Sequence, residues 1–118
     1  SAHLRRFSMR LDGFASMHAD ADGGTWVTRP LMFDGERLEL NFATSAAGRI
    51  LVEVRDADNA PIEGFTFADA IPTIGNEIHK VVRWEGAPDL GALSGRSIRL
   101  AFDMVDGDLF AFRFDGDG

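Results

Sequence analysis

Hydrophobic and polar residues alternate along much of the chain with the period of two that is typical of β-strands with one buried face. The clearest segments are residues 38–42, 50–55, 98–104 and 110–114. In the last of these, Phe110, Phe112 and Phe114 fall on one face, which we expect to be buried. Weaker alternation predicts further strands at residues 7–11, 14–18, 25–29 and 80–84.

Turn-forming dipeptides separate these segments. Asp-Gly pairs occur at residues 12–13, 22–23, 34–35, 106–107 and 115–116. Asp and Gly supply the side-chain hydrogen bonds and positive φ angles that tight turns need. A turn is also expected at the small residues 44–48, between two of the strongest strand segments. One short helical turn is expected near residues 89–93, with Asp89 as its N-cap and Gly95 ending it.

Eight or nine short strands, each with one buried face, predict an all-β fold. A second layer must cover those faces, so we expect an antiparallel β-sandwich of jelly-roll-like form. The length of 118 residues is that of a single domain, which would occupy residues 1–118. Residues 115–118 are expected to be a frayed tail.

Charge and composition exclude several classes of partner. The formal net charge is −7, from 12 Lys and Arg against 19 Asp and Glu. Nucleic acids and anionic membrane surfaces are bound by excess positive charge, so neither is expected as a partner. No apolar run approaches the ~20 residues of a membrane-spanning helix. The absence of cysteine excludes disulfides and zinc–thiolate sites, whereas neutral ligands stay open.

The residues offer little support for catalysis. Most Asp residues neighbour Gly, Ala or Asn in expected turns, and no pair stands out as the carboxylate couple of a glycosidase. Ser45 lacks the Gly-x-Ser-x-Gly motif of a nucleophilic serine. We therefore expect the chain not to be an enzyme by itself. A small enzyme with two facing carboxylates is the alternative.

No cofactor is expected, and calcium is the alternative that stays open. Residues 20–23 begin like an EF-hand loop, but the twelfth position of that loop is Leu31 instead of the bidentate Glu. A calcium site assembled from separate loops would take its ligands from Asp20, Asp22, Asp56 and Asp58. The histidines, His3, His18 and His79, have no spacing that suggests transition-metal ligation.

Sugar binding requires an aromatic ring beside polar groups, because sugar C–H faces stack on rings while hydroxyls take hydrogen bonds. The chain has no tyrosine, and most of its 10 phenylalanines fall on inward strand positions. The carbohydrate-binding candidates are Trp84 and Trp26, with Arg83 and Glu85 flanking Trp84. A place in the core or at its edge is the alternative for both tryptophans.

A series of short motifs extends over nearly the whole chain. They are LDGFAS at residues 11–16, GT at 24–25, TRPL at 28–31, LNFATSAAG at 40–48, VEV at 52–54, PIEGF at 61–65, VRWEG at 82–86, IRLAF at 98–102 and residues 106–114. In order and content they resemble the C-terminal module that follows the β-propeller in bacterial proteins related to glycoside hydrolase families 32 and 43. Residues 40–48 are the most distinctive, and Phe110 stands where that module usually has tyrosine.

The resemblance implies a β-sandwich accessory module that is not catalytic and that binds or accompanies carbohydrate. The partners it implies are a neutral polysaccharide or oligosaccharide and the catalytic propeller of a parent glycoside hydrolase. It favours a secreted or periplasmic location. The alternative is a structural domain that packs on the propeller and stabilises it without binding sugar. The module has no settled binding residues, so none is transferred to this chain.

Overall fold

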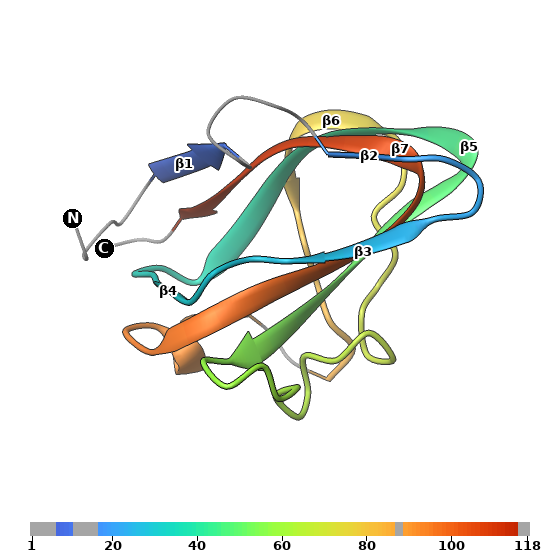
Figure 1. Cartoon of the computed structure of the whole chain (residues 1–118). Helices are drawn as coiled ribbons and strands as arrows, with labels where there is room; N and C mark the ends of the chain where they lie inside the picture. Colours follow the sequence, from blue (N-terminus) through green and yellow to red (C-terminus); the bar gives the residue numbers. More distant parts are fainter. Residues whose placement is uncertain (1–6, 11–16, 87–88, 116–118) are drawn as a thin grey trace.

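The computed structural model describes residues 7–10, 17–86 and 89–115. In this part of the chain, seven strands form one antiparallel sheet, accompanied by a single 3-10 turn (Figure 1). The elements are β1 (Phe7–Arg10), β2 (Met17–Ala19), β3 (Gly24–Val27), β4 (Leu31–Met32), β5 (Arg37–Asp56), β6 (Asn76–Val81), η2 (Gly91–Leu93) and β7 (Ser97–Asp115). No helix in the described ranges has the length and apolar character needed to cross a membrane.

The two long strands, β5 and β7, organise the sheet. They pair antiparallel from Arg37 opposite Asp115 to Asp56 opposite Ile98. β6 pairs with the other edge of β5, and β1, β2, β3 and β4 pair in succession with β7. The sheet curls so that its two halves face each other, as Figure 1 shows. The expected all-β, antiparallel fold is therefore confirmed.

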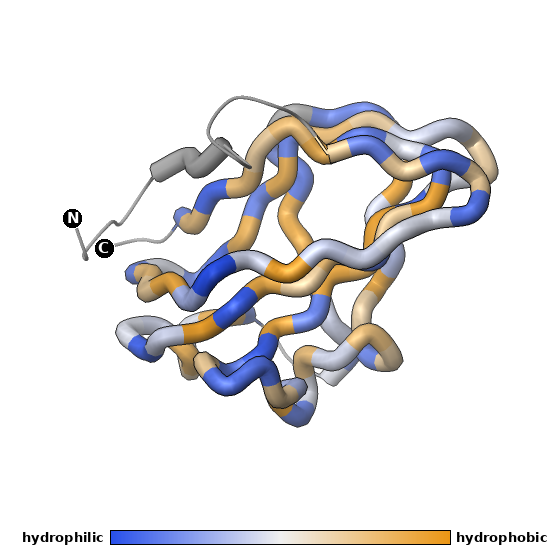
Figure 2. The backbone as a smooth tube through the Cα atoms, in the orientation of Figure 1, coloured by the Kyte–Doolittle hydropathy of each residue, from blue (hydrophilic) through white to orange (hydrophobic). Residues whose placement is uncertain are grey.

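The core lies between the two halves of β5 and β7. Alternate residues of both strands are fully buried and oppose one another across the ladder, and Figure 2 shows the matching alternation of hydropathy along the backbone. The buried pairs are Leu38 with Phe114, Leu40 with Phe112, Ile50 with Met104, Val52 with Phe102 and Val54 with Leu100. Phe102 and Phe112, from opposite halves of β7, have ring centroids 5.7 Å apart, so the two halves meet directly.

Both long strands are irregular at the same place. The register of β5 against β7 shifts between Thr44 and Arg49, opposite Asp106. Asp106 has a φ of 50°, and its carboxylate accepts a hydrogen bond of 2.6 Å from the Ser45 hydroxyl. A bulge of this kind bends a strand and increases its twist. We infer that this shared bulge turns the ladder from one half of the sandwich into the other.

The strand count of seven is lower than the expected eight or nine. The segments 38–42 and 50–55 both belong to β5, and the segments 98–104 and 110–114 both belong to β7. Residues 44–48 and the Asp-Gly pair at 106–107 form a bulge inside the paired strands instead of turns that end them. Each pair of segments that the sequence pattern predicts as two strands is therefore one long strand, because its hydrogen bonding continues across the bend.

Phe110 corrects the expectation that three phenylalanines share the buried face. Its side chain is 41% exposed. The register of β5 against β7 shifts between Asn41 and Phe42, which pair with Ala111 and Leu109. Phe110 is the extra residue of this second bulge, so Leu109 takes the buried position.

The expected helical turn is confirmed as η2, but its N-cap is Leu90 and not Asp89, because the helical residues begin two positions after Asp89. The Asp89 carboxylate accepts a hydrogen bond of 2.8 Å from the Gly91 amide, and Gly95, with a φ of +84°, follows the turn. Asp115 is buried and paired at the end of β7, so it belongs to the strand and not to a frayed tail. Residues 116–118 and the expected turn at residues 12–13 lie outside the described residues.

We expect Gly48→Ala to destabilise the fold, because the bend leaves no room for a Cβ atom. That atom would lie 2.6 Å from the Val105 carbonyl oxygen and still closer to that of Asp106. Overpacking typically costs about 1–3 kcal/mol, and we expect the upper end because backbone atoms cannot move aside. Urea denaturation measures the change in the free energy of unfolding.

Gly95→Ala is the matched control for this variant. Gly95 has a positive φ but no atom within 4 Å of the added Cβ, so only the conformational cost of about 1–2 kcal/mol applies. A loss in Gly48→Ala no larger than that in Gly95→Ala would contradict the close packing at the bend.

Candidate functional site

An open groove of about 240 Å³ lies where the start of β5 meets the chain after β6. Its lining combines four charged and four apolar residues: Glu36, Arg37, Arg83, Asp89, Val81, Val82, Trp84 and Leu90. The volume is below the about 300–1,000 Å³ of sites for drug-sized ligands. Any ligand that fits the groove is therefore smaller than a typical drug-sized molecule.

Backbone hydrogen bonds bring these distant segments together. The Leu90 amide donates to the Glu36 carbonyl at 2.8 Å, and the Val82 amide donates to the Leu38 carbonyl at 2.8 Å. A Cβ added to Gly91 would lie 3.1 Å from Asp89 Oδ1 and 3.6 Å from Glu36 Cγ. The side chains of Glu36 and Asp89 thus approach the same point on the rim of the groove.

The charges around the groove are balanced. Two carboxylates, Glu36 and Asp89, accompany two guanidinium groups, Arg37 and Arg83. Arg37 Nη2 also lies 3.8 Å from Asp115 Oδ2, which draws this cation toward the end of β7. The groove therefore offers both hydrogen-bond donors and acceptors and has no strong preference for a ligand of either sign.

Trp84 forms the inner wall of the groove and belongs to the core. Its side chain is 3% exposed, and Nε1 donates a hydrogen bond of 2.8 Å to the Val52 carbonyl. The Phe65 ring packs edge-on against it, with centroids 5.3 Å apart. Trp84 therefore has the core position that was the alternative to sugar binding, and its ring face is not open for stacking.

The other expected sugar-binding residues are dispersed. Arg83 is exposed and lines the groove with Trp84, whereas Glu85 is exposed but is not part of the lining. Trp26 is half-buried on β3, opposite Phe102, where it packs against the edge of the core. The structure therefore places Arg83 and Trp84 in the groove lining, leaves their neighbour Glu85 outside it, and places Trp26 on another strand.

Sequence reasoning did not single out Glu36, Arg37, Asp89 or Leu90 as groove residues. Two segments far apart in the sequence meet there, and only their turn signals, at residues 34–35 and at Asp89, could be read locally. No local sequence pattern indicates that the carboxylates of Glu36 and Asp89 lie near each other.

The acidic residues considered for calcium serve as turn-forming groups. Asp20 Oδ1 accepts from the Asp22 amide at 3.0 Å. Asp56 Oδ1 accepts from the amides of Asp58 and Ala60 at 2.9 and 3.0 Å. Among the described residues, no group of three or more His, Cys, Asp or Glu side chains is arranged to hold a metal ion.

Two histidines pair with carboxylates. His18 Nδ1 lies 2.8 Å from Asp108 Oδ1, and His79 Nδ1 lies 3.3 Å from Glu39 Oε1. Both histidine side chains are well exposed, whereas Glu39 is buried and also receives two hydrogen-bond-length contacts from Arg113. These pairs hold neighbouring strands together and do not adjoin the groove.

Comparison of the chain with protein-family models, with curated protein sequences and with solved structures found no match in any of the three.

The two tryptophans should differ in fluorescence. In a Trp26→Phe variant, only the buried Trp84 remains, so we expect blue-shifted emission and weak quenching by acrylamide. In a Trp84→Phe variant, the half-buried Trp26 should be quenched more strongly. Trp84→Phe also leaves the buried Val52 carbonyl without its partner, which should reduce the free energy of unfolding by about 1–3 kcal/mol. Equal quenching in the two variants would contradict the burial of Trp84.

Proposed function

We propose that this chain is a non-catalytic carbohydrate-associated module and that the groove beside Arg83 binds one unit of a neutral saccharide. The observation that supports the proposal is the balanced set of two carboxylates and two guanidinium groups around one small groove. The resemblance to the C-terminal module of glycoside hydrolases related to families 32 and 43 points in the same direction. In that setting the partners are a neutral polysaccharide or oligosaccharide and a catalytic propeller.

The chemistry of the groove suits a ring covered with hydroxyl groups. Each sugar hydroxyl can donate and accept, so the Arg83 guanidinium can donate to one and the Glu36 carboxylate can accept from another. Half-buried Val81 is the apolar lining residue with surface left for the C–H groups of the ring, because Val82, Trp84 and Leu90 are buried. Recognition would rest on the polar rim, because the Trp84 ring is enclosed in the core.

A specific feature favours a second candidate, a structural domain that packs on a neighbouring propeller. Ile71 and Ile74 are 42% and 50% exposed within a few residues of each other. Between them, Thr73 exchanges two backbone hydrogen bonds of 2.9 Å with Ile50, so the segment is anchored to β5. Anchored apolar side chains on a surface are typical of protein interfaces.

Arg83→Ala should weaken sugar binding about tenfold or more. A hydrogen bond to a charged group contributes about 1.5–3 kcal/mol, and 1.4 kcal/mol is a tenfold change in affinity. Titration calorimetry with a panel of neutral plant and microbial oligosaccharides provides the measurement. Arg96→Ala is the control, because Arg96 is exposed and does not line the groove.

Two results would overturn the proposal, one from the titration and one from an assay of reducing-sugar release. One is that no neutral glycan binds at millimolar concentration, with or without calcium. The other is that the native chain releases reducing sugar and Glu36→Gln does not, because this would make Glu36 and Asp89 a catalytic carboxylate pair.

The second candidate has its own measurement. An Ile71→Ser, Ile74→Ser variant should fold as the native chain does, because both side chains are largely exposed, and it should bind less of a hydrophobic dye such as anilinonaphthalene sulfonate. Unchanged dye binding would show that these residues form no coherent apolar surface. Ala46→Ser, at an exposed position on the bend, is the control.

A further inference from the structure

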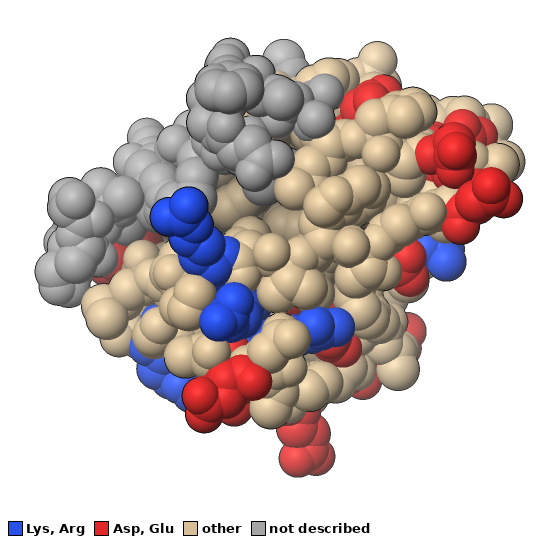
Figure 3. Space-filling view, viewed as in Figure 1, with Lys and Arg blue, Asp and Glu red and all other residues tan. Residues whose placement is uncertain are grey.

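Arginine residues from three neighbouring segments lie side by side at one end of the sheet. Arg55 in β5 and Arg99 in β7 are direct cross-strand partners. Arg99 Nη1 donates to the Thr28 carbonyl at 3.1 Å, which places the next residue, Arg29, beside it. We call Arg29, Arg55 and Arg99 the arginine row. Figure 3 shows several Lys and Arg side chains on the left and centre of this face, with Asp and Glu side chains beside some of them.

The row concentrates positive charge in a chain whose net charge is −7. Like charges directly opposite each other on a sheet are destabilising. In the described part of the chain, Glu53 is the one carboxylate hydrogen-bonded to the row, through Arg55 Nε at 2.7 Å. Glu53 is 5% exposed, and its other oxygen accepts from the Phe67 amide at 2.9 Å. Among the described residues, Arg29 and Arg99 therefore have no carboxylate as a hydrogen-bond partner, although Asp56 and Asp58 lie in the turn that adjoins the row.

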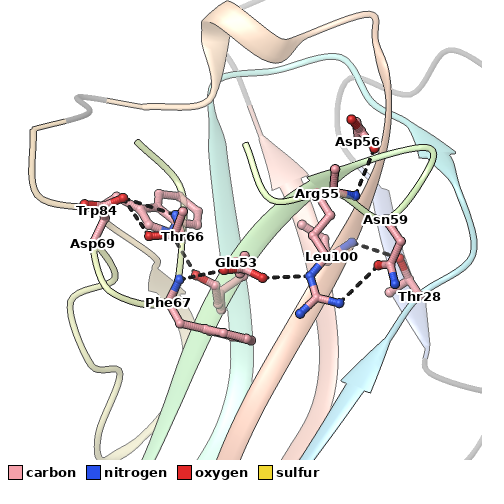
Figure 4. Close-up of polar contacts among 12 residues, drawn as sticks. Thr28, Glu53, Arg55, Asp56, Asn59, Thr66, Phe67, Asp69, Trp84 and Leu100 are labelled. Carbon is pink, nitrogen blue, oxygen red and sulfur yellow. Dashed lines mark hydrogen bonds and ion pairs between the residues drawn. The ribbon is translucent and has the colours of Figure 1, made fainter. Parts of the chain in front are cut away.

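Two of the three guanidinium groups are held in place. Arg99 Nε donates to the Ala57 carbonyl at 3.0 Å, in addition to its bond to Thr28. Arg55 reaches between Glu53 and Asn59, donating to Asn59 Oδ1 at 3.1 Å, as Figure 4 shows. These bonds orient the groups without neutralising them, because apart from Glu53 every acceptor is uncharged.

Arg29 is the accessible member of the row. It is exposed, and within the described residues its guanidinium group has no hydrogen-bond or ion-pair partner, although its carbonyl accepts from the Thr28 hydroxyl. An incoming anion can therefore meet Arg29 without displacing an existing contact. The fixed Arg99 beside it would supply a second donor.

We propose that the arginine row binds the anionic groups of an acidic saccharide, either carboxylates of uronic acid units or sulfate esters. This inference rests on the proposed function for the class of ligand and assigns it a second surface, separate from the groove. A guanidinium group matches carboxylate and sulfate oxygens with two parallel hydrogen bonds. Neighbouring strands lie about 4.8 Å apart, so adjacent charged units of a saccharide can meet Arg29 and Arg99. Arg55, whose side chain is 18% exposed and paired with Glu53, adds positive charge behind them.

A short row fits a short anionic stretch better than a nucleic acid. Strong nucleic-acid binding depends on many phosphate contacts along a basic surface. The chain as a whole has 19 acidic against 12 basic side chains, and this excess would repel a long polyanion. A few charged sugar units can bind at the row without contacting much of the remaining surface.

The test uses titration calorimetry of the full chain at low salt with trigalacturonate, a sulfated trisaccharide and an uncharged trisaccharide. We expect at least one of the two charged sugars to bind, and comparing their affinities distinguishes carboxylate from sulfate recognition. That binding should weaken as the salt concentration is raised. Arg29→Ala should weaken it at least fivefold and Arg29→Lys less, because lysine keeps the charge but loses the two-pronged geometry. Arg96→Ala, an exposed arginine outside the row, should leave it unchanged.

Crossed variants separate this inference from the proposed function. Arg29→Ala should spare the binding of neutral sugar at the groove, and Arg83→Ala should spare the binding of charged sugar at the row. The proposal for the arginine row would be overturned if Arg29→Ala bound both charged sugars as the native chain does, or if the native chain bound neither. Binding of the neutral sugar would in that case still support the proposed function of the groove. Equal affinity for a polyglutamate peptide or single-stranded DNA would overturn the assignment to saccharide.

Discussion

The fold depends on a single ladder of hydrogen bonds, between β5 and β7, that continues through a bend. The two strands have 20 and 19 residues, and each contributes to both halves of the sandwich. Met104 and Leu109 are both buried although they are an odd number of residues apart, which strict alternation would place on opposite faces. The bulge at Asp106 corrects this phase, so that β7 keeps an apolar face inward on both sides of the bend.

The same constraint explains which parts of the fold could be predicted. Period-two alternation follows directly from burial on one face, so the core positions of β5 and β7 were evident, apart from Phe110. Asp, Gly and small residues serve bulges as well as turns, because both need positive φ or close backbone approach. A local pattern cannot distinguish the two. The choice depends on whether the partner strand bends at the same place, which is a long-range property.

The candidate site was less predictable than the fold because it depends on contacts between distant segments. Arg83 and Trp84 were recognised by residue type. Glu36 and Asp89 come to the same groove because the Leu90 amide donates a hydrogen bond to the Glu36 carbonyl, a long-range contact that no local pattern indicates. Trp84 was ambiguous because an indole serves equally in a core and on a binding surface. The irregular chain between β5 and β6 decides the matter: it supplies Phe65, which packs edge-on against the indole and encloses it.

Charge shows most clearly how composition and local structure can point to different ligands. The net charge of −7 favours neutral partners, and the groove, with its balanced charges, agrees with that expectation. Yet exposed charges interact mainly within a screening length of about 10 Å, so a ligand that contacts a small surface responds to the groups of that surface. At the arginine row those groups include three cations, of which Arg55 alone is hydrogen-bonded to a carboxylate among the described residues. The argument from net charge therefore applies to extended polyanions, which contact much of the surface, and it does not decide whether a short anionic ligand binds at one end of the sheet.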